Sequence, residues 1–307
     1  MSCLLNRVAV AICLLPGWTM LEAADQPKSA KSVIAFTIRS AADGRWSQAK
    51  TWQPARVPKA GDRVLITRGT RVTYDVASTA VIRMVQVAGT LEFARDRNTE
   101  LNVGLLKVQN SQVCSESGFA CDFHGTNDAG EPHAAPKGPR PALLIGTPES
   151  PIPAGHTARV RLHFLEGMDR NTAPAIACCS ARMEIHGSPL SRSWVELGAD
   201  AGPGDRQLVL GEAVSGWRKG DELIVTGSER RRAGRTYRGN PQSATTEVRR
   251  ITAIDGRRLT LDSPLAETHP GSGEFRCEVA NLSRNVVIES ADPGGVRGHT
   301  VFHRFSR

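Results

Sequence analysis

Short stretches that alternate apolar and polar side chains constrain this chain most strongly. In residues 160–164, positions 160, 162 and 164 are apolar, and Arg161 and His163 lie between them. Similar stretches occur at residues 183–186, 208–210, 259–261 and 286–288. A period of two sends successive side chains to opposite faces of a β-strand, whereas an amphipathic helix repeats every 3.6 residues. Helical periodicity is almost absent, so the sequence predicts an all-β fold with a ladder of short strands.

The composition agrees with many strands joined by turns. The 307 residues include 29 glycines and 18 prolines, and only 5% are aromatic. Glycine, proline, aspartate or asparagine follows most of the alternating stretches within a few residues, as turns require. The length suffices for one large β-domain or two smaller ones. Closely spaced turns predict a sandwich, a barrel or a solenoid, and the pattern alone does not choose among them.

Two segments of the chain echo each other. Residues 58–67 and 217–226 each place a Gly-Asp pair before an apolar strand. We expect Gly61 and Gly220 to adopt a backbone conformation that a side chain would resist. We expect Asp62 and Asp221 to accept hydrogen bonds from the amides of their own turns. The two aspartates are therefore interpreted as structural.

The N-terminus has the order of a secretory signal peptide. Arg7 precedes an apolar run at residues 8–15, Pro16 breaks the run, and residues 21–24 end in small side chains. This order predicts that residues 1–24 are removed during export. A membrane anchor is disfavoured because the apolar run is too short to span a bilayer. We expect a secreted or cell-surface protein that contacts a membrane only through the uncleaved signal.

Export would place five cysteines in an oxidising compartment, namely Cys114, Cys121, Cys178, Cys179 and Cys277. Cys114 and Cys121 close a short loop and are predicted to form a disulfide that adds roughly 2–3 kcal/mol. His124 and His133 could complete a zinc site with the same two cysteines. The compartment favours the disulfide, so we predict no metal and no cofactor. The partners of the other three cysteines stay open.

Positive charge is concentrated in one stretch of a chain whose formal net charge is +8. Residues 230–238 include the candidate ligand-binding residues Arg230, Arg231, Arg232, Arg235, Tyr237 and Arg238. Arginine binds carboxylates and sulfates through paired N–H groups, and a tyrosine ring can stack on a sugar. The alternative is a solvated loop without a ligand. Nucleic acid is disfavoured because the chain is exported and offers few aromatic side chains on which bases could stack.

Several motifs resemble the G-eight (eight-glycine) extracellular domain family. They lie at residues 44–47, 51–52, 57–58, 61–66, 85–93, 145–151 and 158–164. The resemblance continues at residues 183–187, Ser193-Trp194, Trp217 with Gly220-Asp221, and residues 282–288. These later motifs are similar to the segment that follows the domain in fibrocystin and the cell-surface hyaluronidases.

The resemblance implies a domain order and a fold. It implies a G-eight-like domain at residues 43–190 after the signal peptide at 1–24. Residues 191–307 would be a β-rich segment resembling the start of a right-handed parallel β-helix. Relatives continue into further coils where this chain stops at Arg307, so we expect a solenoid truncated at its C-terminus.

The resemblance also implies a link to carbohydrate. We expect a module that binds polysaccharide, with part of a hyaluronidase-like depolymerase as the alternative, whose active groove would need further coils. A purely structural cell-surface module is a third possibility. Glycoside hydrolysis requires two carboxylates facing each other across the bond. The available residues are Glu196, Glu222, Glu247, Glu274 and Glu278. The sequence does not pair them, so no catalytic residue is nominated and the question of an enzyme stays open.

Overall fold

The computed structural model describes residues 34–112, 114–120, 139–227 and 245–303. Within these ranges the chain forms β-strands and one short 3-10 helix, so the all-β prediction is confirmed. No helix in this part of the chain is long and apolar enough to cross a bilayer. The elements are β1 Ile38–Ser40, β2 Gly44–Arg45, η1 Ala49–Thr51, β3 Trp52–Gln53, β4 Arg63–Ile66, β5 Arg71–Tyr74, β6 Ala77–Val87, β7 Thr90–Phe93, β8 Thr99–Gln109, β9 Ala142–Ile145, β10 Ala158–Leu162, β11 Ala175–Cys179, β12 Arg182–Ile185, β13 Trp194–Glu196, β14 Gln207–Val209, β15 Glu222–Val225, β16 Glu247–Asp255, β17 Arg258–Leu261, β18 Glu278–Asn281, β19 Val286–Ser290 and β20 His299–Phe302.

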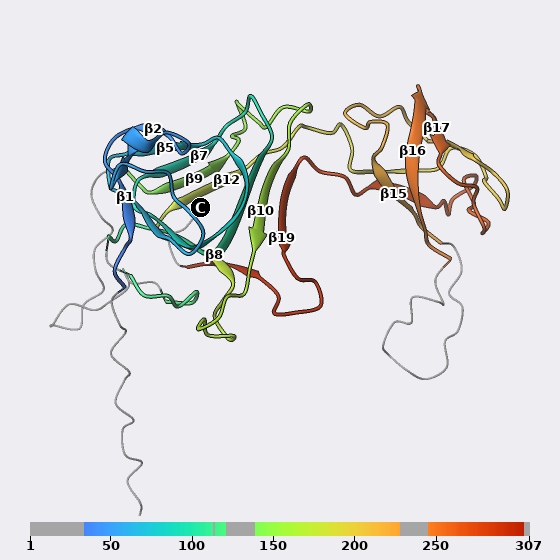
Figure 1. Cartoon of the computed structure of the whole chain (residues 1–307). Coiled ribbons are helices and arrows are strands. Elements are labelled where there is room, and N and C mark those ends of the chain that lie inside the picture. Colours follow the sequence, from blue (N-terminus) through green and yellow to red (C-terminus); the bar gives the residue numbers. More distant parts are fainter. Residues whose placement is uncertain (1–33, 113, 121–138, 228–244, 304–307) are drawn as a thin grey trace, which may run out of the picture. The chain divides into compact units, whose positions relative to one another are not determined.

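Two sheets form a first body, which we call the ladder (Figure 1). One sheet runs β19-β10-β8-β6-β4-β1-β3, with β11 and β20 beside this path, and the other runs β12-β9-β7-β5-β2. Among the described residues, every strand pair in these sheets is parallel except β1 with β3. From β4 to β9 the chain alternates between the sheets, so successive passes stack on one another.

The register of the ladder repeats and builds a continuous core. Val64 lies opposite Val85, and Val85 lies opposite Leu106, so equal lengths of chain separate these strands. In the other sheet, Leu91 lies opposite Leu143. All five side chains are fully buried in one hydrophobic cluster. Burying each Val or Leu contributes roughly 1.5–3 kcal/mol, which explains why these strands are so rich in aliphatic residues.

Aromatic side chains fill the first passes of the ladder. Trp46 packs against Trp52 and Tyr74 with ring centroids 4.9 and 5.0 Å apart, and Tyr74 lies 5.1 Å from Phe93. All four rings are buried. The indole N–H of Trp52 donates to the Trp46 carbonyl oxygen at 2.9 Å, so this burial leaves that N–H hydrogen-bonded.

The two Gly-Asp turns have the predicted conformation. Gly61 and Gly220 have φ angles of 81° and 91°. In each turn the backbone N–H three residues before the aspartate donates to Oδ2 of Asp62 or Asp221 at 2.8 Å. The turns launch β4 and β15, so local turn chemistry sets where these strands begin.

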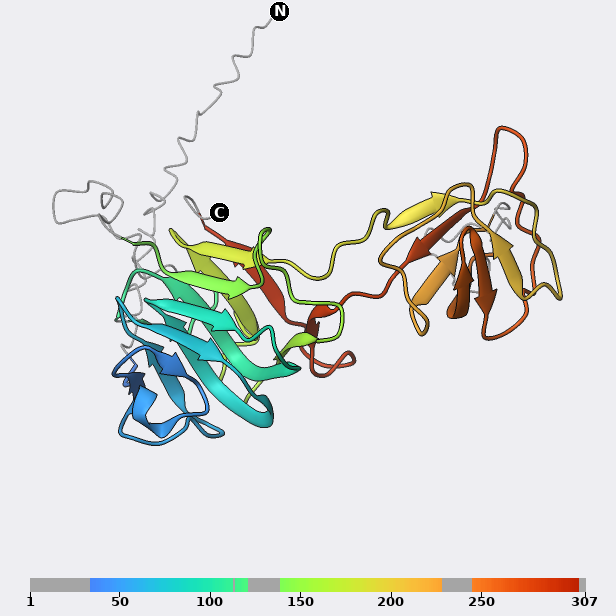
Figure 2. The same cartoon turned by 90° about the horizontal axis from the view of Figure 1, so that it is seen from above.

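A second body, which we call the lobe, contains β13–β18 (Figure 2). Its order is β13-β18-β15-β16-β17-β14, and every one of these pairs is antiparallel. A bridge between Leu197 and Leu210, the residues after β13 and β14, joins the two ends of the sheet. The sheet therefore closes around its own hydrophobic cluster, which includes Leu208, Leu223 and Leu259.

The segment predicted at residues 191–307 is divided between the lobe and the ladder. After β12 the chain leaves the ladder and forms the lobe, and it then returns at β19 and β20. β19 pairs in parallel with β10, so that Val160 lies opposite Ile288, and β20 pairs in parallel with β11. Residues 194–281 are thus antiparallel, where the resemblance had implied a parallel coil.

Cys121 lies outside the described residues, so the disulfide predicted between Cys114 and Cys121 stays a prediction. Cys114 is buried in an apolar cluster with Met84 and Leu105. Cys179 is disulfide-bonded.

Candidate functional site

The predicted polysaccharide contact, Arg230, Arg231, Arg232, Arg235, Tyr237 and Arg238, lies outside the described residues. The structure describes the strands on either side of this basic stretch. β15 ends at Val225, which lies opposite Glu247 at the start of β16. The Gly227 N–H donates to Thr246 Oγ1 at 3.2 Å. The chain is therefore held in an antiparallel pair both before and after the basic stretch.

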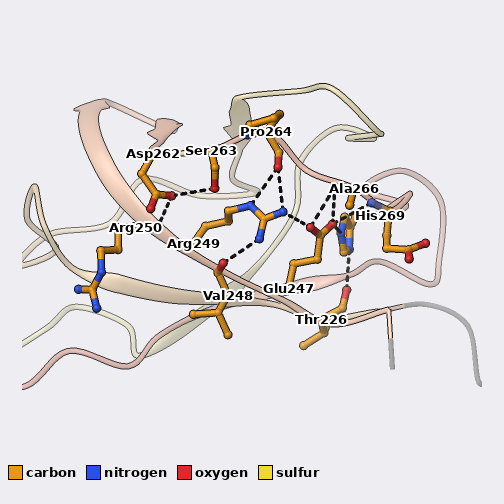
Figure 3. Close-up of polar contacts among 11 residues, drawn as sticks. Thr226, Glu247, Val248, Arg249, Arg250, Asp262, Ser263, Pro264, Ala266 and His269 are labelled. Carbon is orange, nitrogen blue, oxygen red and sulfur yellow. Dashed lines mark hydrogen bonds and ion pairs between the residues drawn. The ribbon is translucent and has the colours of Figure 1, made fainter. Parts of the chain in front are cut away.

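A buried polar cluster lies beside this junction (Figure 3). His269 is fully buried, and its Nδ1 lies 2.8 Å from the carbonyl oxygen of Thr226. A carbonyl oxygen only accepts, so Nδ1 carries a hydrogen and donates it. His269 Nε2 lies 2.9 Å from Glu247 Oε1. One proton must therefore lie between the imidazole and the carboxyl group.

The Glu247 carboxyl group is the centre of this cluster. It accepts hydrogen bonds from the backbone N–H groups of residues 266–267 at 2.9–3.1 Å and from the Arg249 guanidinium. Burial alone would raise the pKa of Glu247, but the hydrogen bonds from His269 and the two amides, with the Arg249 charge, hold it below the usual value. Glu247 is thus a buried anchor that ties β16 to the segment before β18, and a polymer could not reach it.

An open hollow of about 560 Å³ lies along β13. Trp194 is 54% exposed at its rim, while the next side chain, Val195, is buried in the core of the lobe. The alternation continues with exposed Glu196. The charged residues that line the hollow are Arg192, Glu196, Glu212 and Arg276.

The charges around the hollow are arranged in pairs. Arg192 Nε lies 2.8 Å from Glu212 Oε1, and Arg276 Nη1 lies 4.0 Å from Glu196 Oε2. The Trp217 indole N–H donates to the Arg192 carbonyl oxygen at 2.7 Å, which fixes the backbone beside Trp194. The hollow therefore combines an exposed indole ring with guanidinium donors and carboxylate acceptors in equal number.

This arrangement suits a sugar better than a wholly apolar or wholly charged ligand. A pyranose ring has faces rich in C–H groups and edges rich in hydroxyl groups. An indole ring such as Trp194 offers a large apolar surface for a face, and charged forks form strong hydrogen bonds with hydroxyls. We therefore treat the hollow beside Trp194 as the candidate binding site.

A second hollow lies beside β19 and contains Arg161, Arg297 and His299. Arg161 Nε donates to Glu289 at 2.6 Å, and Arg297 donates to the Pro293 carbonyl oxygen at 2.7 Å. Burial lowers the pKa of His299. No Trp, Tyr or Phe side chain is among the described residues that line this hollow. Within the described ranges, no three His, Cys, Asp or Glu side chains are arranged to hold a metal ion.

The sequence alone indicates only part of this site. Glu196 is a candidate carboxylate and Trp194 belongs to a family motif, but no sequence pattern indicates Arg192 or Arg276. Trp194 could have indicated the site, because a tryptophan next to a buried valine in a strand must point toward solvent. The position of Arg276 beside β13 depends on strand pairing and could not be predicted from the sequence.

Comparison with known proteins identifies one domain family. Residues 51–198 match the G8 domain. The chain is 26% identical to human fibrocystin-L over 259 residues, which covers 80% of this chain and 5% of that protein. It is 24% identical to mouse fibrocystin over 290 residues, which covers 86% of this chain and 6% of that protein. Protein rliB of Dictyostelium discoideum is 21% identical over 251 residues, covering 80% of this chain and 19% of rliB. The chain thus spans a small fraction of the length of these relatives.

Two solved structures show weak similarity. The tailspike gp61 of Pseudomonas phage phi297 aligns with a TM-score of 0.28 and 12% identity, covering 75% of this chain and 24% of that chain. The gp54 tailspike of Acinetobacter baumannii bacteriophage AP22, in complex with capsular saccharide, aligns with a TM-score of 0.25 and 8% identity, covering 77% and 24%. These TM-scores are too low to establish a shared fold.

Proposed function

We propose that this chain, which matches the G8 domain over residues 51–198, is an exported carbohydrate-associated module that binds polysaccharide. Export rests on the signal-like order of residues 1–24. Binding rests on one observation, the exposed Trp194 ring between the Arg192–Glu212 and Arg276–Glu196 pairs. Such a site would hold a sugar face on the indole and its hydroxyls on the charged flanks.

The proposal includes an architecture. The G8-like domain would span residues 43–190, with the remaining β structure in residues 191–307. The ladder would be a right-handed parallel β-helix into which the lobe is inserted. The repeated parallel register supports this, because crossover connections between parallel strands of one sheet are almost always right-handed.

The test is binding of the chain without residues 1–24 to a glycan array, followed by electrophoresis through gels that contain each bound polysaccharide. We expect Trp194→Ala to weaken binding at least several-fold, because aromatic stacking contributes about 1–3 kcal/mol by alanine substitution on nucleic-acid bases. Phe275→Ala is the matched control, since Phe275 is 85% exposed and lies outside the lining of the hollow. Unchanged binding of the Trp194 variant to every glycan would refute the site.

The second candidate function is depolymerisation. The pairing of β13 with β18 places Glu196 directly opposite Glu278. Such cross-strand residues have Cβ atoms about 4.5–5.5 Å apart, which brings two carboxyl groups together beside Trp194. Product analysis after incubation with each bound polysaccharide tests this idea, with Glu196→Gln and Glu278→Gln as inactive controls. If wild-type protein releases no oligosaccharide, the depolymerase hypothesis is wrong, and the proposal that the chain binds polysaccharide is unaffected.

A further inference from the structure

A row of apolar side chains crosses the outer face of the lobe, starting at Trp194. Trp194 lies opposite Ala280, Ala280 opposite Ile224, and Ile224 opposite Val248. Directly opposite residues share one face of a sheet. Trp194 and Val248, at the two ends, are 54% and 53% exposed, and the two between them are partly exposed. We call these four residues the outer row.

The neighbouring row on the same strands points the other way. Val195, Val279, Val225 and Glu247 lie opposite one another in that order and are all buried. The lobe therefore has an apolar core without the outer row, so core packing does not explain why the row is apolar. A small alanine beside Trp194 also leaves the indole face uncovered.

The outer row is narrow and has polar neighbours. Strands lie about 4.8 Å apart, so the row extends about 14 Å across four strands. Glu196, Glu278 and Thr226 follow one another along one side. On the other side, Arg250 Nη2 donates to Glu222 at 2.5 Å, although Leu282 widens the apolar strip there. A strip with apolar centre and hydrogen-bonding margins matches a chain of sugar rings, which has C–H faces and hydroxyl edges.

Charge identifies the class of sugar. The carboxylates around the row are Glu196, Glu212, Glu222 and Glu278, and the guanidinium groups are Arg192, Arg250 and Arg276. Each of these arginines pairs with one of the glutamates. Among these described residues no guanidinium lacks a carboxylate partner, and an acidic polymer would meet the fourth carboxylate.

We propose that the outer row and the hollow beside Trp194 together bind a run of several neutral sugar units. This inference rests on the proposed polysaccharide binding and names its ligand class and its extent. The row differs in this respect from the basic stretch at residues 230–238, whose composition suits acidic sugars.

The experiment measures Trp fluorescence and calorimetric affinity for neutral cello- and chito-oligosaccharides of increasing length, with hyaluronan oligosaccharides as the acidic arm. We expect affinity for at least one neutral series to rise with length until the row is filled. We also expect it to stay constant between about 50 mM and about 500 mM salt, because no ion pair with the ligand is formed. Trp194→Ala and Val248→Ser should each weaken binding several-fold, and Phe275→Ala should not.

The outcomes separate the two proposals. Binding of acidic sugars alone that disappears with salt overturns the neutral class while leaving polysaccharide binding in place. A loss in Trp194→Ala with none in Val248→Ser limits the site to the hollow and overturns the row. Absence of any saccharide binding on the wider array overturns both. Circular dichroism and urea unfolding of each variant confirm that the lobe stays folded, which is expected because both substituted side chains are exposed.

Discussion

At the scale of single residues, Asp62 shows how one side chain stabilises the ladder. Its buried carboxylate accepts hydrogen bonds from Arg56 at 2.6 and 2.9 Å, and from the Lys59 N–H and the Thr37 hydroxyl at 2.8 Å. Burial alone would raise the pKa of Asp62, but the hydrogen bonds from Arg56, Lys59 and Thr37 outweigh it and lower the pKa to about 2. Since the unfolded carboxyl titrates near 3.9, the ionised group contributes about 2 kcal/mol at neutral pH.

We predict that Asp62→Asn lowers the free energy of unfolding at pH 7 by roughly 2 kcal/mol. The folded pKa is depressed, so this contribution is complete above the unfolded pKa and is lost as pH falls from about 4 to about 2. Wild type and variant should therefore converge in urea unfolding over that interval. Glu149→Gln, at an exposed position, is the control and should change little. A constant difference down to pH 2 would contradict the ionisation account.

Cysteine chemistry gives a second prediction at this scale. Alkylation in denaturant should modify Cys179 only after reduction, because Cys179 is disulfide-bonded. The measurement is peptide mapping by mass spectrometry. Alkylation of Cys179 without reductant would contradict this prediction.

These residues show what local sequence can predict. The Gly-Asp turns at Gly61 and Gly220 were predictable because their hydrogen bonds form within four residues. The disulfide of Cys179 was not, because a cysteine's partner depends on which strands become neighbours. The burial of Cys114 with Met84 and Leu105 of β6 and β8 likewise depends on contacts between strands.

At the scale of elements, strands were easier to predict than their partners. Residues 160–162 lie in β10 and residues 259–261 lie in β17, and both stretches have alternating burial. The predicted alternation does not extend to Phe164, which lies beyond β10 and is exposed. β10 pairs with β8 and with β19, and β19 lies beyond the whole lobe in sequence. No periodicity encodes that register. The same limit explains why Arg276 and Glu212 could not be assigned to the hollow beside β13.

The basic stretch at residues 230–238 carries a prediction at this scale. The chain on both sides of it is held by the β15–β16 pair, and the Glu247 cluster anchors the start of β16. Replacing Arg230, Arg231, Arg232, Arg235 and Arg238 with serine should remove the salt-sensitive part of retention on heparin and hyaluronan columns. Five clustered charges act within a Debye length of about 8 Å, so their effect should fall steeply with salt.

Two controls belong to that measurement. Tyr237→Ala should reduce the retention that persists at high salt if its ring stacks on sugar. Trp194→Ala should leave heparin retention unchanged, because heparin is acidic and we propose that the outer row binds neutral sugars. Equal retention of wild type and the five-fold serine variant would mean that the stretch is only a solvated loop.

At the scale of the whole molecule, the described strands form two groups, the ladder and the lobe, which we interpret as two folding units. The ladder has its own hydrophobic core, and β19 and β20 complete it after the chain has built the lobe. The lobe has a separate core that includes Leu223, Leu259 and Val279. In the described part of the chain, β13–β18 pair as strands only with one another. An insertion of this kind costs little, because loop-closure entropy grows by only about 0.6 kcal/mol for each doubling of loop length.

The last prediction follows from that division. Residues 190–283 expressed alone should fold, because the sheet closes through the Leu197–Leu210 bridge and its core needs no side chain from the ladder. We expect β-type circular dichroism, one cooperative urea transition and the same affinity for neutral oligosaccharides as the longer chain. The reciprocal variant replaces residues 191–282 with a short Gly/Ser linker and should keep the ladder while losing that affinity. An unfolded isolated segment together with an intact ladder variant would mean that the lobe depends on the ladder for its stability, and the two-unit description would then be wrong.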